Sequence, residues 1–424
     1  MRVLFVTYPE NSNVKLIAPL AWAFRAAGHE VQVAGHPESA AFVRAAGLTA
    51  VPLGRDHILW SYYDRRPHLA ESRRRGEVPI YGRGDAPAEE LTWDYLKGHF
   101  ATVVGLEYRM INDPLLHPLV DYCQTWRPDL VLWESTTVAG AVAAEACGAV
   151  HGRLTWSMDF QGRYRRRYAG LLAERPAHDR PDPLGEWLAA RAERHGVGFR
   201  EEMITGLFTV EQLPEEFRSE VDLPLVPMRF VPFNGASDVP EWVWRPLDRR
   251  RVCVTLGATV RDRLKIDLVD VPELVEALGE VDAEVVATFA AHRREGLLEK
   301  VPPNVRLVDF VPFDTLLPTC SAFVHHGGIG AFSTALAAGT PQVVLPEIHD
   351  TPARASRLQA LGAGVCLPHE SADGDGVIAA IDRVLRDPGL QEEAGRLRGQ
   401  VMSMPAPSEV AAELVRRVQE GVRA

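Results

Sequence analysis

Length, composition and charge exclude several classes of protein. The chain has 424 residues, 46% of them hydrophobic, and carries 46 basic against 57 acidic residues, a net charge of -11. This length suits two domains with separate apolar cores. Because a nucleic-acid partner would favour a basic surface, the acidic balance argues against one.

The cysteines and the start of the chain indicate the cell compartment. The five cysteines are scattered and odd in number, which predicts free buried thiols and neither a disulfide framework nor a zinc site. The sequence begins directly with a strand pattern, and no apolar run is long enough to span a membrane. We therefore expect a cytoplasmic protein with no membrane partner.

Short apolar runs alternate with helical patterns in the first half of the chain. This pace of alternation predicts a parallel, doubly wound α/β sheet. Residues 55–91 lose the periodicity and are expected to form a long loop. The basic segment 163–168 is interpreted as a solvated helix face. Strands are expected at residues 2–8, 30–34, 49–53, 129–133 and 151–156, and helices at residues 14–27, 38–46, 91–125, 138–147 and 182–205.

The alternation restarts after a proline-rich stretch. This stretch predicts a linker at residues 229–246 between a domain of residues 1–228 and one of residues 247–424. The last helix, residues 409–422, is expected to pack back onto the first domain. Strands of the second domain are expected at residues 251–256, 284–287, 306–308, 343–345 and 365–367, and its other helices at residues 351–361, 376–386 and 391–402.

One glycine-rich stretch predicts an anion site. The apolar run that begins at Ser321 ends in His325-His326-Gly327-Gly328, and a helical pattern of small residues follows. A strand, a glycine turn and a helix aim backbone N–H groups and a helix dipole at an anion. No Lys follows the glycines, and Ser333 stands where a dinucleotide fingerprint has its third glycine. A purely structural turn is the alternative to a diphosphate site in which His326 donates a hydrogen bond.

This motif carries a resemblance to a known family. Together with AGTPQVVLP and Asp350-Thr351, it resembles the donor site of GT-B glycosyltransferases of family 1. More narrowly, the chain is similar to the bacterial enzymes of antibiotic biosynthesis that move TDP-deoxysugars onto macrolide and anthracycline polyketides, such as the erythromycin desosaminyltransferases. The resemblance extends over nearly the whole chain, through residues 19–31, 45–52, 126–131, 250–257 and 316–320.

The resemblance implies a fold and a reaction. The fold would be GT-B, with two doubly wound Rossmann-like domains facing a central cleft. The reaction would be an inverting transfer of a deoxysugar from a TDP-sugar to a polyketide-type natural-product aglycone. The TDP-sugar is a co-substrate, and no other cofactor is expected. No metal is expected either, because a helix N-terminus and a histidine can hold the diphosphate without one. An auxiliary activator protein and a homodimer are open as partners.

Eight residues are implied to bind the donor. Val311 would contact the base, Gly257 would approach the donor, and Asp350 with Thr351 would contact the sugar, although Asp350 could also cap the following helix. The family commonly has Gln at the position of Thr351, and Thr suits a deoxysugar with fewer hydroxyls. The diphosphate would be bound by His326, Gly328, Gly330 and the N–H of Ala331, where a hydroxyl residue is common in the family.

The catalytic base is less well determined. Family members usually carry a histidine at the position of Asn13, and an amide cannot take a proton at neutral pH. Glu134, at the end of a predicted strand, is the replacement we expect, and a charge at a helix start is its alternative role. Asp159 is a second candidate carboxylate. His36 and His57 follow other early strands and could also substitute.

Three other functions stay open at this point. A C-glycosyltransferase acting on an aromatic acceptor would need only a carboxylate. A catalytically silent accessory homologue is suggested by Asn13 and Ala331, although the complete diphosphate motif argues against it. A GT-B epimerase of nucleotide sugars shares the expected fold but lacks the stretches at residues 19–31 and 340–346.

Overall fold

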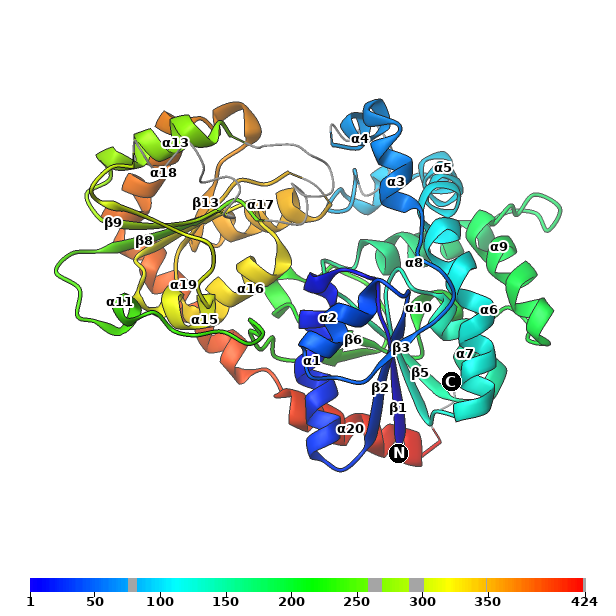
Figure 1. Ribbon diagram of the computed structural model, residues 1–424. Helices are drawn as coiled ribbons and strands as arrows, with labels where there is room; N and C mark the ends of the chain where they lie inside the picture. The colour runs from blue at the N-terminus through cyan, green and yellow to red at the C-terminus, as the bar shows by residue number, and fades with distance from the viewer. Residues whose placement is uncertain (75–81, 258–268, 290–300, 348, 422–424) are drawn as a thin grey trace. The chain divides into compact units, whose positions relative to one another are not determined.

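Two parallel sheets organise the protein, and each lies in its own compact unit (Figure 1). The computed structural model describes residues 1–74, 82–257, 269–289, 301–347 and 349–421. Residues 1–229 and the chain from Pro405 onward form the first unit, and residues 230–404 form the second. The α/β class predicted from the sequence is confirmed.

The first unit contains a seven-stranded sheet in the order β3-β2-β1-β4-β5-β6-β7. The order reverses between β1 and β4, and open sheets of this kind bind ligands at the carboxyl ends of the strands beside the reversal. The central strands read as apolar runs because both faces are covered. The strands are β1 (Arg2–Val6), β2 (Glu30–Gly35), β3 (Ala50–Pro52), β4 (Leu130–Glu134), β5 (Val150–Leu154), β6 (Thr209–Glu211) and β7 (Leu225–Pro227).

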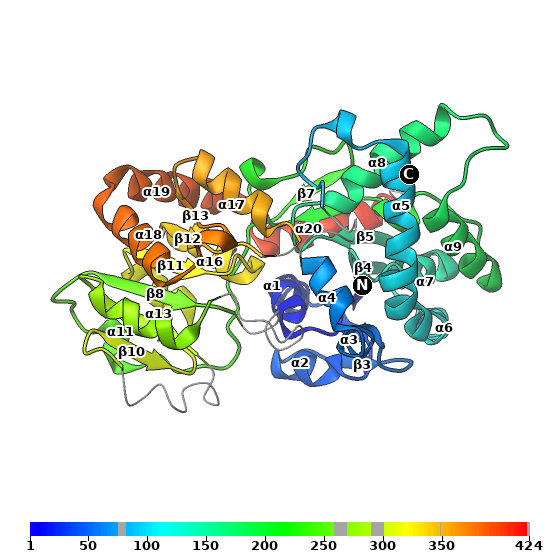
Figure 2. The same cartoon turned by 90° about the horizontal axis from the view of Figure 1, so that it is seen from above.

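Helices cover both faces of this sheet. The last helix, α20, packs against α1 within the first unit, and the two lie side by side in Figure 1 and Figure 2. A π-helical turn at Val104–Tyr108 joins α5 to α6. The helices are α1 (Asn11–Ala26), α2 (Ser39–Ala45), α3 (Leu59–Asp64), α4 (Pro67–Arg74), α5 (Trp93–Val103), α6 (Arg109–Trp126), α7 (Ala139–Cys147), α8 (Phe160–Ala173), α9 (Pro183–Ala192), α10 (Glu202–Thr205) and α20 (Pro407–Gln419).

Three local expectations for the first unit are wrong. The stretch expected as a loop contains α3 and α4; its residues 75–81 lie outside the described part. The single helix expected at residues 182–205 is interrupted at Gly196, whose φ of 75° ends a helical segment. The basic segment 163–168 is not a solvated face, because the Arg165 guanidinium is buried in ion pairs with Asp182 and Glu201.

The second unit contains a six-stranded sheet in the order β10-β9-β8-β11-β12-β13. Its order reverses between β8 and β11. The side chains of β8 alternate between two apolar clusters, with Val252 and Val254 in one and Cys253 in the other. The strands are β8 (Arg251–Thr255), β9 (Glu284–Thr288), β10 (Val305–Val308), β11 (Ala322–His325), β12 (Gln342–Val344) and β13 (Gly364–Cys366).

Each face of this second sheet carries its own helices. In Figure 1, α13 and α18 lie on one side of β8 and β9, and α15 and α16 lie on the other. Within the stretch expected as a linker, Val243 is buried in the cluster that contains Cys253 and Phe323. The helices are α11 (Glu241–Trp244), α13 (Val271–Ala277), α15 (Phe313–Leu316), α16 (Ile329–Ala338), α17 (Thr351–Ala360), α18 (Gly374–Arg386) and α19 (Pro388–Ser403).

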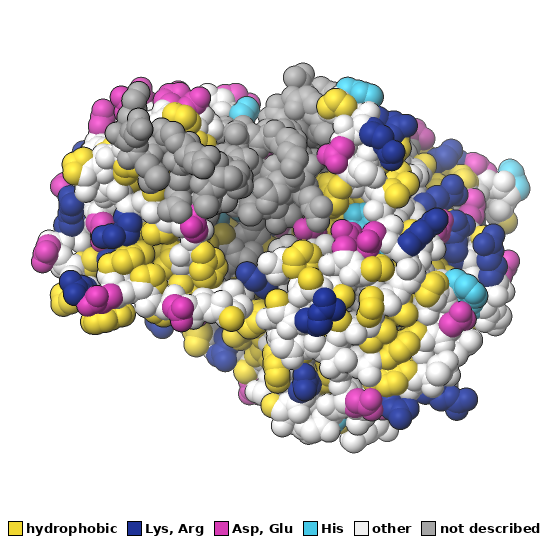
Figure 3. Space-filling view, viewed as in Figure 1, with side chains coloured by type: hydrophobic (Ala, Val, Ile, Leu, Met, Phe, Trp, Pro, Cys, Tyr) yellow, Lys and Arg dark blue, Asp and Glu magenta, His cyan; other side chains and the backbone are white. Residues whose placement is uncertain are grey.

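Apolar side chains are exposed on the surface of the second unit. Figure 3 shows hydrophobic side chains gathered on the second unit around α11 and α15. Large apolar side chains of this unit that stay exposed are Val239, Trp244, Leu247, Phe310 and Met402. Among the described residues, no helix is long and apolar enough to cross a membrane.

Candidate active site

The predicted anion site lies at the carboxyl end of β11, beside the reversal in strand order. β11 ends at His325, and α16 begins at Ile329 with Gly328 as its N-cap. The first N–H groups of a helix have no partner within it, and the helix dipole makes this end partly positive. The local structure predicted from the glycine motif is therefore present.

His326 is enclosed by two glycine backbones. A Cβ atom added to Gly257 would lie 2.2 Å from Cε1 of the His326 ring, and one added to Gly328 would lie 2.5 Å from its Nε2. Gly257 also has a φ of 71°, which side chains other than glycine rarely adopt. The structure thus brings together three residues predicted for the donor site, from the ends of β8 and β11.

The electrostatics of His326 suit a neutral hydrogen-bond donor. Burial and the nearby Arg354 guanidinium lower the pKa of His326 to about 4, so the ring is uncharged at neutral pH. Its Nδ1 atom is buried and has no hydrogen-bond partner among the described residues. A neutral imidazole still carries one N–H, which can donate to a phosphate oxygen.

His325 has a structural role. Its Nδ1 accepts a hydrogen bond from the N–H of Gly327 at 3.0 Å, so the proton is on Nε2, which donates to Oε1 of Gln342 at 2.8 Å. Burial and His326 lower the pKa of His325 to about 3. The ring also stacks on Phe323, with centroids 4.7 Å apart. These contacts of His325 hold the glycine turn in place.

Asp350 and Thr351 stand at the start of α17. Asp350 occupies the N-cap position, but its side chain makes no capping hydrogen bond. Its carboxylate instead forms two hydrogen bonds with Arg354, from Nε to Oδ2 at 2.6 Å and from Nη2 to Oδ1 at 3.0 Å. The Thr351 hydroxyl accepts from the N–H of Glu347 at 3.0 Å. A Cβ added to Gly327 would lie 3.0 Å from Cβ of Thr351, so α17 starts close to the glycine turn.

The remaining predicted donor residues differ in whether the residue is exposed or buried. Gly330 is exposed in the first turn of α16, and a Cβ added there would meet no atom of the described residues within 4 Å. Ala331 packs against the apolar cluster that also buries Val311. Because the Val311 side chain is buried, only its backbone could contact a base. Residues 258–268, after Gly257, lie outside the described part of the chain.

Glu134 ends β4 of the first unit, beside the reversal in strand order. Its carboxyl is buried and accepts hydrogen bonds from the Ser135 hydroxyl at 3.2 Å and from the hydroxyl and N–H of Thr136. Burial raises the pKa of Glu134 to about 7, although the Thr136 hydrogen bonds act in the opposite direction. A carboxyl with such a pKa exchanges its proton readily at neutral pH.

Asp159 is engaged in a buried ion pair. Its carboxylate contacts the Arg153 guanidinium through both oxygens, one of them 2.9 Å from Nη1. It also caps α8 by accepting from the N–H of Gly162 at 2.9 Å. Both side chains are buried. These contacts favour a structural role for Asp159 over that of a base.

Asn13 lies half-buried in the first turn of α1, and its backbone N–H donates to the carbonyl of Glu10 at 3.1 Å. Glu10 carries a carboxylate that sequence reasoning missed. Glu10 directly precedes α1 and is buried, and its Oε1 accepts from Nε1 of Trp60 at 3.0 Å. The position of Glu10 just after the first apolar strand is the sequence signal that could have identified it as a candidate. The contact with Trp60 spans 50 residues of sequence, so no local pattern predicts it.

His36 and His57 lie together, with ring centroids 5.3 Å apart. Nε2 of His36 donates to the carbonyl of Ile111 at 2.8 Å, and burial lowers the pKa of His36. Nδ1 of His57 accepts from the N–H of Leu59 at 3.1 Å, and its ring stacks on Tyr8. Because both rings are held by protein contacts, a structural role is favoured for each.

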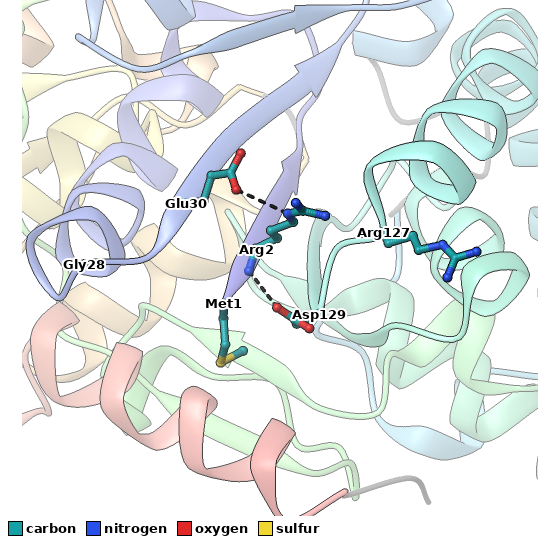
Figure 4. A pocket seen from close by; sticks show the side chains of 6 residues that line it. All are labelled: Met1, Arg2, Gly28, Glu30, Arg127 and Asp129. Atoms are coloured by element: carbon teal, nitrogen blue, oxygen red, sulfur yellow. Dashed lines mark hydrogen bonds and ion pairs between the residues drawn. The ribbon is translucent and has the colours of Figure 1, made fainter.

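A surface depression of about 430 Å³ lies at the opposite end of the first sheet (Figure 4). Three of its residues are joined to one another by hydrogen bonds. Arg2 bonds to Glu30 at 3.3 Å through Nε and to Asp129 at 2.7 Å through its N–H. Ligands of parallel sheets bind at the other end of the strands. The lining residues are Met1, Arg2, Gly28, Glu30, Arg127 and Asp129.

Comparison with known proteins shows the family. Two family models match the chain, and both are described as "Erythromycin biosynthesis protein CIII-like". The model of the N-terminal domain matches residues 22–257, and the model of the C-terminal domain matches residues 272–416. The chain belongs to this erythromycin CIII-like family. Its fold is GT-B and its class is nucleotide-sugar-dependent glycosyltransferase, as the sequence resemblance predicted.

Three members and neighbours illustrate the relationship. The 3-alpha-mycarosylerythronolide B desosaminyl transferase of Saccharopolyspora erythraea is 42% identical over 97% of this chain and 96% of its own length. The aklavinone 7-beta-L-rhodosaminyltransferase of Streptomyces galilaeus is 42% identical over 98% and 95%. The crystal structure of glycosyltransferase VinC in complex with dTDP has a TM-score of 0.88 and is 36% identical, over 99% of this chain and all of VinC.

Proposed function

We propose that this enzyme transfers a deoxysugar from a TDP-sugar to a polyketide-type aglycone with inversion at the anomeric carbon. The observation that carries the proposal is the neutral His326 ring, enclosed by Gly257 and Gly328 at the start of α16. The names of relatives that act on macrolide and anthracycline aglycones support the acceptor class. The VinC complex with dTDP supports the nucleotide.

The donor half of the reaction needs stabilisation of the leaving diphosphate. As the bond between the anomeric carbon and the diphosphate oxygen breaks, negative charge grows on that oxygen. In our proposal His326 and the N–H groups of Gly328, Gly330 and Ala331 donate to the diphosphate. Preorganised donors of this kind stabilise charge more in the transition state than in the ground state. The Val311 backbone would contact the thymine, and Asp350 and Thr351 would face the sugar.

The acceptor half needs removal of a proton. We assign this to Glu134, whose raised pKa allows it to accept a proton near neutral pH. The acceptor atom forms its bond to the anomeric carbon from the face opposite the diphosphate, TDP leaves, and the proton moves to Glu134. Asn13 cannot take the proton, so its role would be to orient the acceptor by a hydrogen bond.

Partners and acceptor chemistry are part of the same proposal. A carboxylate base can serve either an alcohol or an activated aromatic carbon, so O- and C-glycosylation are distinguished by the product.

The exposed apolar side chains of the second unit, Val239 and Trp244 among them, offer a surface for an auxiliary protein or a second copy of the chain. Sedimentation of the purified chain separates a homodimer from a monomer.

Turnover tests the proposed function. The enzyme is incubated with a TDP-deoxysugar and with one macrolide or one anthracycline aglycone, and products are analysed by mass spectrometry and NMR. We expect one sugar to be added per aglycone, TDP to be released and the anomeric configuration to be inverted. His326→Ala is the matched inactive control. Release of free sugar without transfer, or retention of configuration, would contradict the proposal.

A further inference from the structure

Asn112 connects α6 to the turn that follows β4. The residue is fully buried, and its side-chain amide makes three hydrogen bonds. Nδ2 donates to the carbonyl of Tyr108 at 2.9 Å and to that of Thr136 at 3.0 Å, and Oδ1 accepts from the N–H of Ala139 at 2.9 Å. Both N–H donors of the amide are therefore used. One of them binds within α6, and the other holds a segment that lies 24 residues further along the chain.

This turn between β4 and α7 carries hydrogen-bond donors to Glu134. The N–H of Thr137 donates to the backbone carbonyl of Glu134 at 2.7 Å and closes the turn. Within the turn, Thr136 donates to Oε2 of Glu134 through its hydroxyl and through its N–H, the latter at 3.2 Å. The carbonyl of the same Thr136 is the group that Asn112 holds. A displacement of Thr136 would thus move both of these donors relative to the carboxyl.

Asn112 also supplies an acceptor to the start of α7. Ala139 is the first residue of this helix and is buried, and its N-cap Val138 has no side chain that could accept a hydrogen bond. The first N–H groups of a helix need partners from outside it, and Asn112 provides one from α6. The π-helical turn that precedes α6 ends at Tyr108, whose carbonyl Asn112 binds. Such turns occur frequently at functional sites.

We propose that Asn112 is a positioning residue for the base, because it holds Thr136 where both donors of that residue meet the Glu134 carboxyl. The inference rests on the assignment of Glu134 under the proposed function and adds a residue that acts through Thr136. The Thr136 hydrogen bonds lower the pKa of Glu134, against the effect of burial. Loss of Asn112 should therefore raise the pKa of Glu134 further, so that less of the base is ionised at neutral pH.

Other groups near Glu134 stay unchanged when Asn112 is replaced. A further hydrogen bond, from Trp156, also lowers the pKa of Glu134. Because Asn112 is uncharged, an uncharged replacement acts on this pKa through the hydrogen bonds that Asn112 positions. Titratable groups that share the region belong to the π-helical turn, β5 and the start of α8, and they are Tyr108, Glu107, Arg153 and Asp159.

The pH dependence of turnover tests this chain of contacts. Asn112→Thr has nearly the same volume, and its hydroxyl can bond to the Tyr108 carbonyl within the helix, but it lacks the amide that joins Thr136 to Ala139. We expect the midpoint of kcat/KM for the acceptor to rise by about one pH unit, and its value at pH 7 to fall about fivefold. TDP binding, measured by calorimetry, should stay unchanged.

A matched control separates this effect from a general loss of stability. Asn304 of the second unit likewise donates through Nδ2 to backbone carbonyls, those of Leu278 and Val281 at 3.0 and 3.1 Å. Asn304→Thr should lower the stability in urea but leave the midpoint of the pH profile where it is in the wild type. An equal shift in Asn304→Thr would overturn the inference.

Thr136→Val interrupts the same contacts at their other end. It removes the hydroxyl donor to Glu134 and keeps the carbonyl that Asn112 holds, so its midpoint should also rise. This variant decides the matter even if Asn112→Thr fails to fold. An unchanged midpoint in either variant would overturn the inference. If Glu134→Gln itself keeps the pH dependence of the wild type, the assignment of the base under the proposed function is wrong.

Discussion

Replacement of Glu134 by Gln separates catalysis from stability, because the chain contains a matched carboxyl. Glu134 and Glu211 are both buried at the carboxyl end of a strand of the same sheet, β4 and β6. Burial raises the pKa of each from 4.5 to about 7. Only Glu134 is assigned as the base, so Glu211→Gln controls for the removal of a buried carboxyl.

The effect on stability follows from the direction of these shifts. A raised pKa means that the folded state keeps its proton at a pH where the unfolded chain has lost it. The folded state therefore loses stability as pH rises from about 4.5 through 7. For one group the loss between pH 5 and pH 8 is about 2 to 3 kcal/mol. Each Gln variant should lack this share of the pH dependence when urea unfolding is measured at both pH values.

The effect on activity should differ between the two variants. With a saturating TDP-deoxysugar, kcat/KM for the acceptor should rise through about pH 7 in the wild type as Glu134 loses its proton. Glu134→Gln should lower kcat by about 10² to 10⁴, the usual contribution of a general base, and Glu211→Gln should leave it nearly unchanged. Equal losses in both variants, or a loss below tenfold for Glu134→Gln, would refute the assignment of the base.

Two further substitutions test the neighbouring assignments. Gly257→Ala adds a methyl group against the His326 ring at a positive φ, and we expect a loss of about 1 to 3 kcal/mol in stability and at least tenfold weaker TDP binding. Gly330→Ala, whose methyl would meet no atom of the described residues, should keep its stability in urea. Asp159→Asn leaves Arg153 buried and unpaired, which costs about 3 to 5 kcal/mol; a variant of normal stability with a hundredfold lower kcat would instead make Asp159 catalytic.

The glycine turn between β11 and α16 could be predicted because its parts are consecutive in the sequence. The apolar strand that ends in His325, the glycines and the small-residue helix follow one another directly, and local sequence determines each. The hydrogen bond between His325 and Gln342 was not predicted, because the two residues lie 17 positions apart on neighbouring strands. The position of Gly257 followed from the end of its strand.

Contacts between residues that are far apart in the sequence, and the burial of charged residues, could not be predicted from local sequence. Arginines usually lie on the surface, so the buried ion pairs of Arg153 and Arg165 have no signature in composition. The contact between Glu10, which precedes α1, and Trp60 of α3 joins residues 50 positions apart in the sequence. The spacing of Asp350 and Arg354 is that of an ordinary surface pair on a helix, and only the packing of α17 shows that the pair is buried.

Nucleotide binding tests the central claim most directly. Calorimetry of the wild type with TDP and with UDP, repeated with His326→Ala, measures whether the turn between β11 and α16 is a diphosphate site. We expect TDP to bind more tightly than UDP and the substitution to weaken TDP at least tenfold, since one charge-assisted hydrogen bond is lost. If His326→Ala binds TDP as tightly as the wild type, the donor site has been placed on the wrong residues.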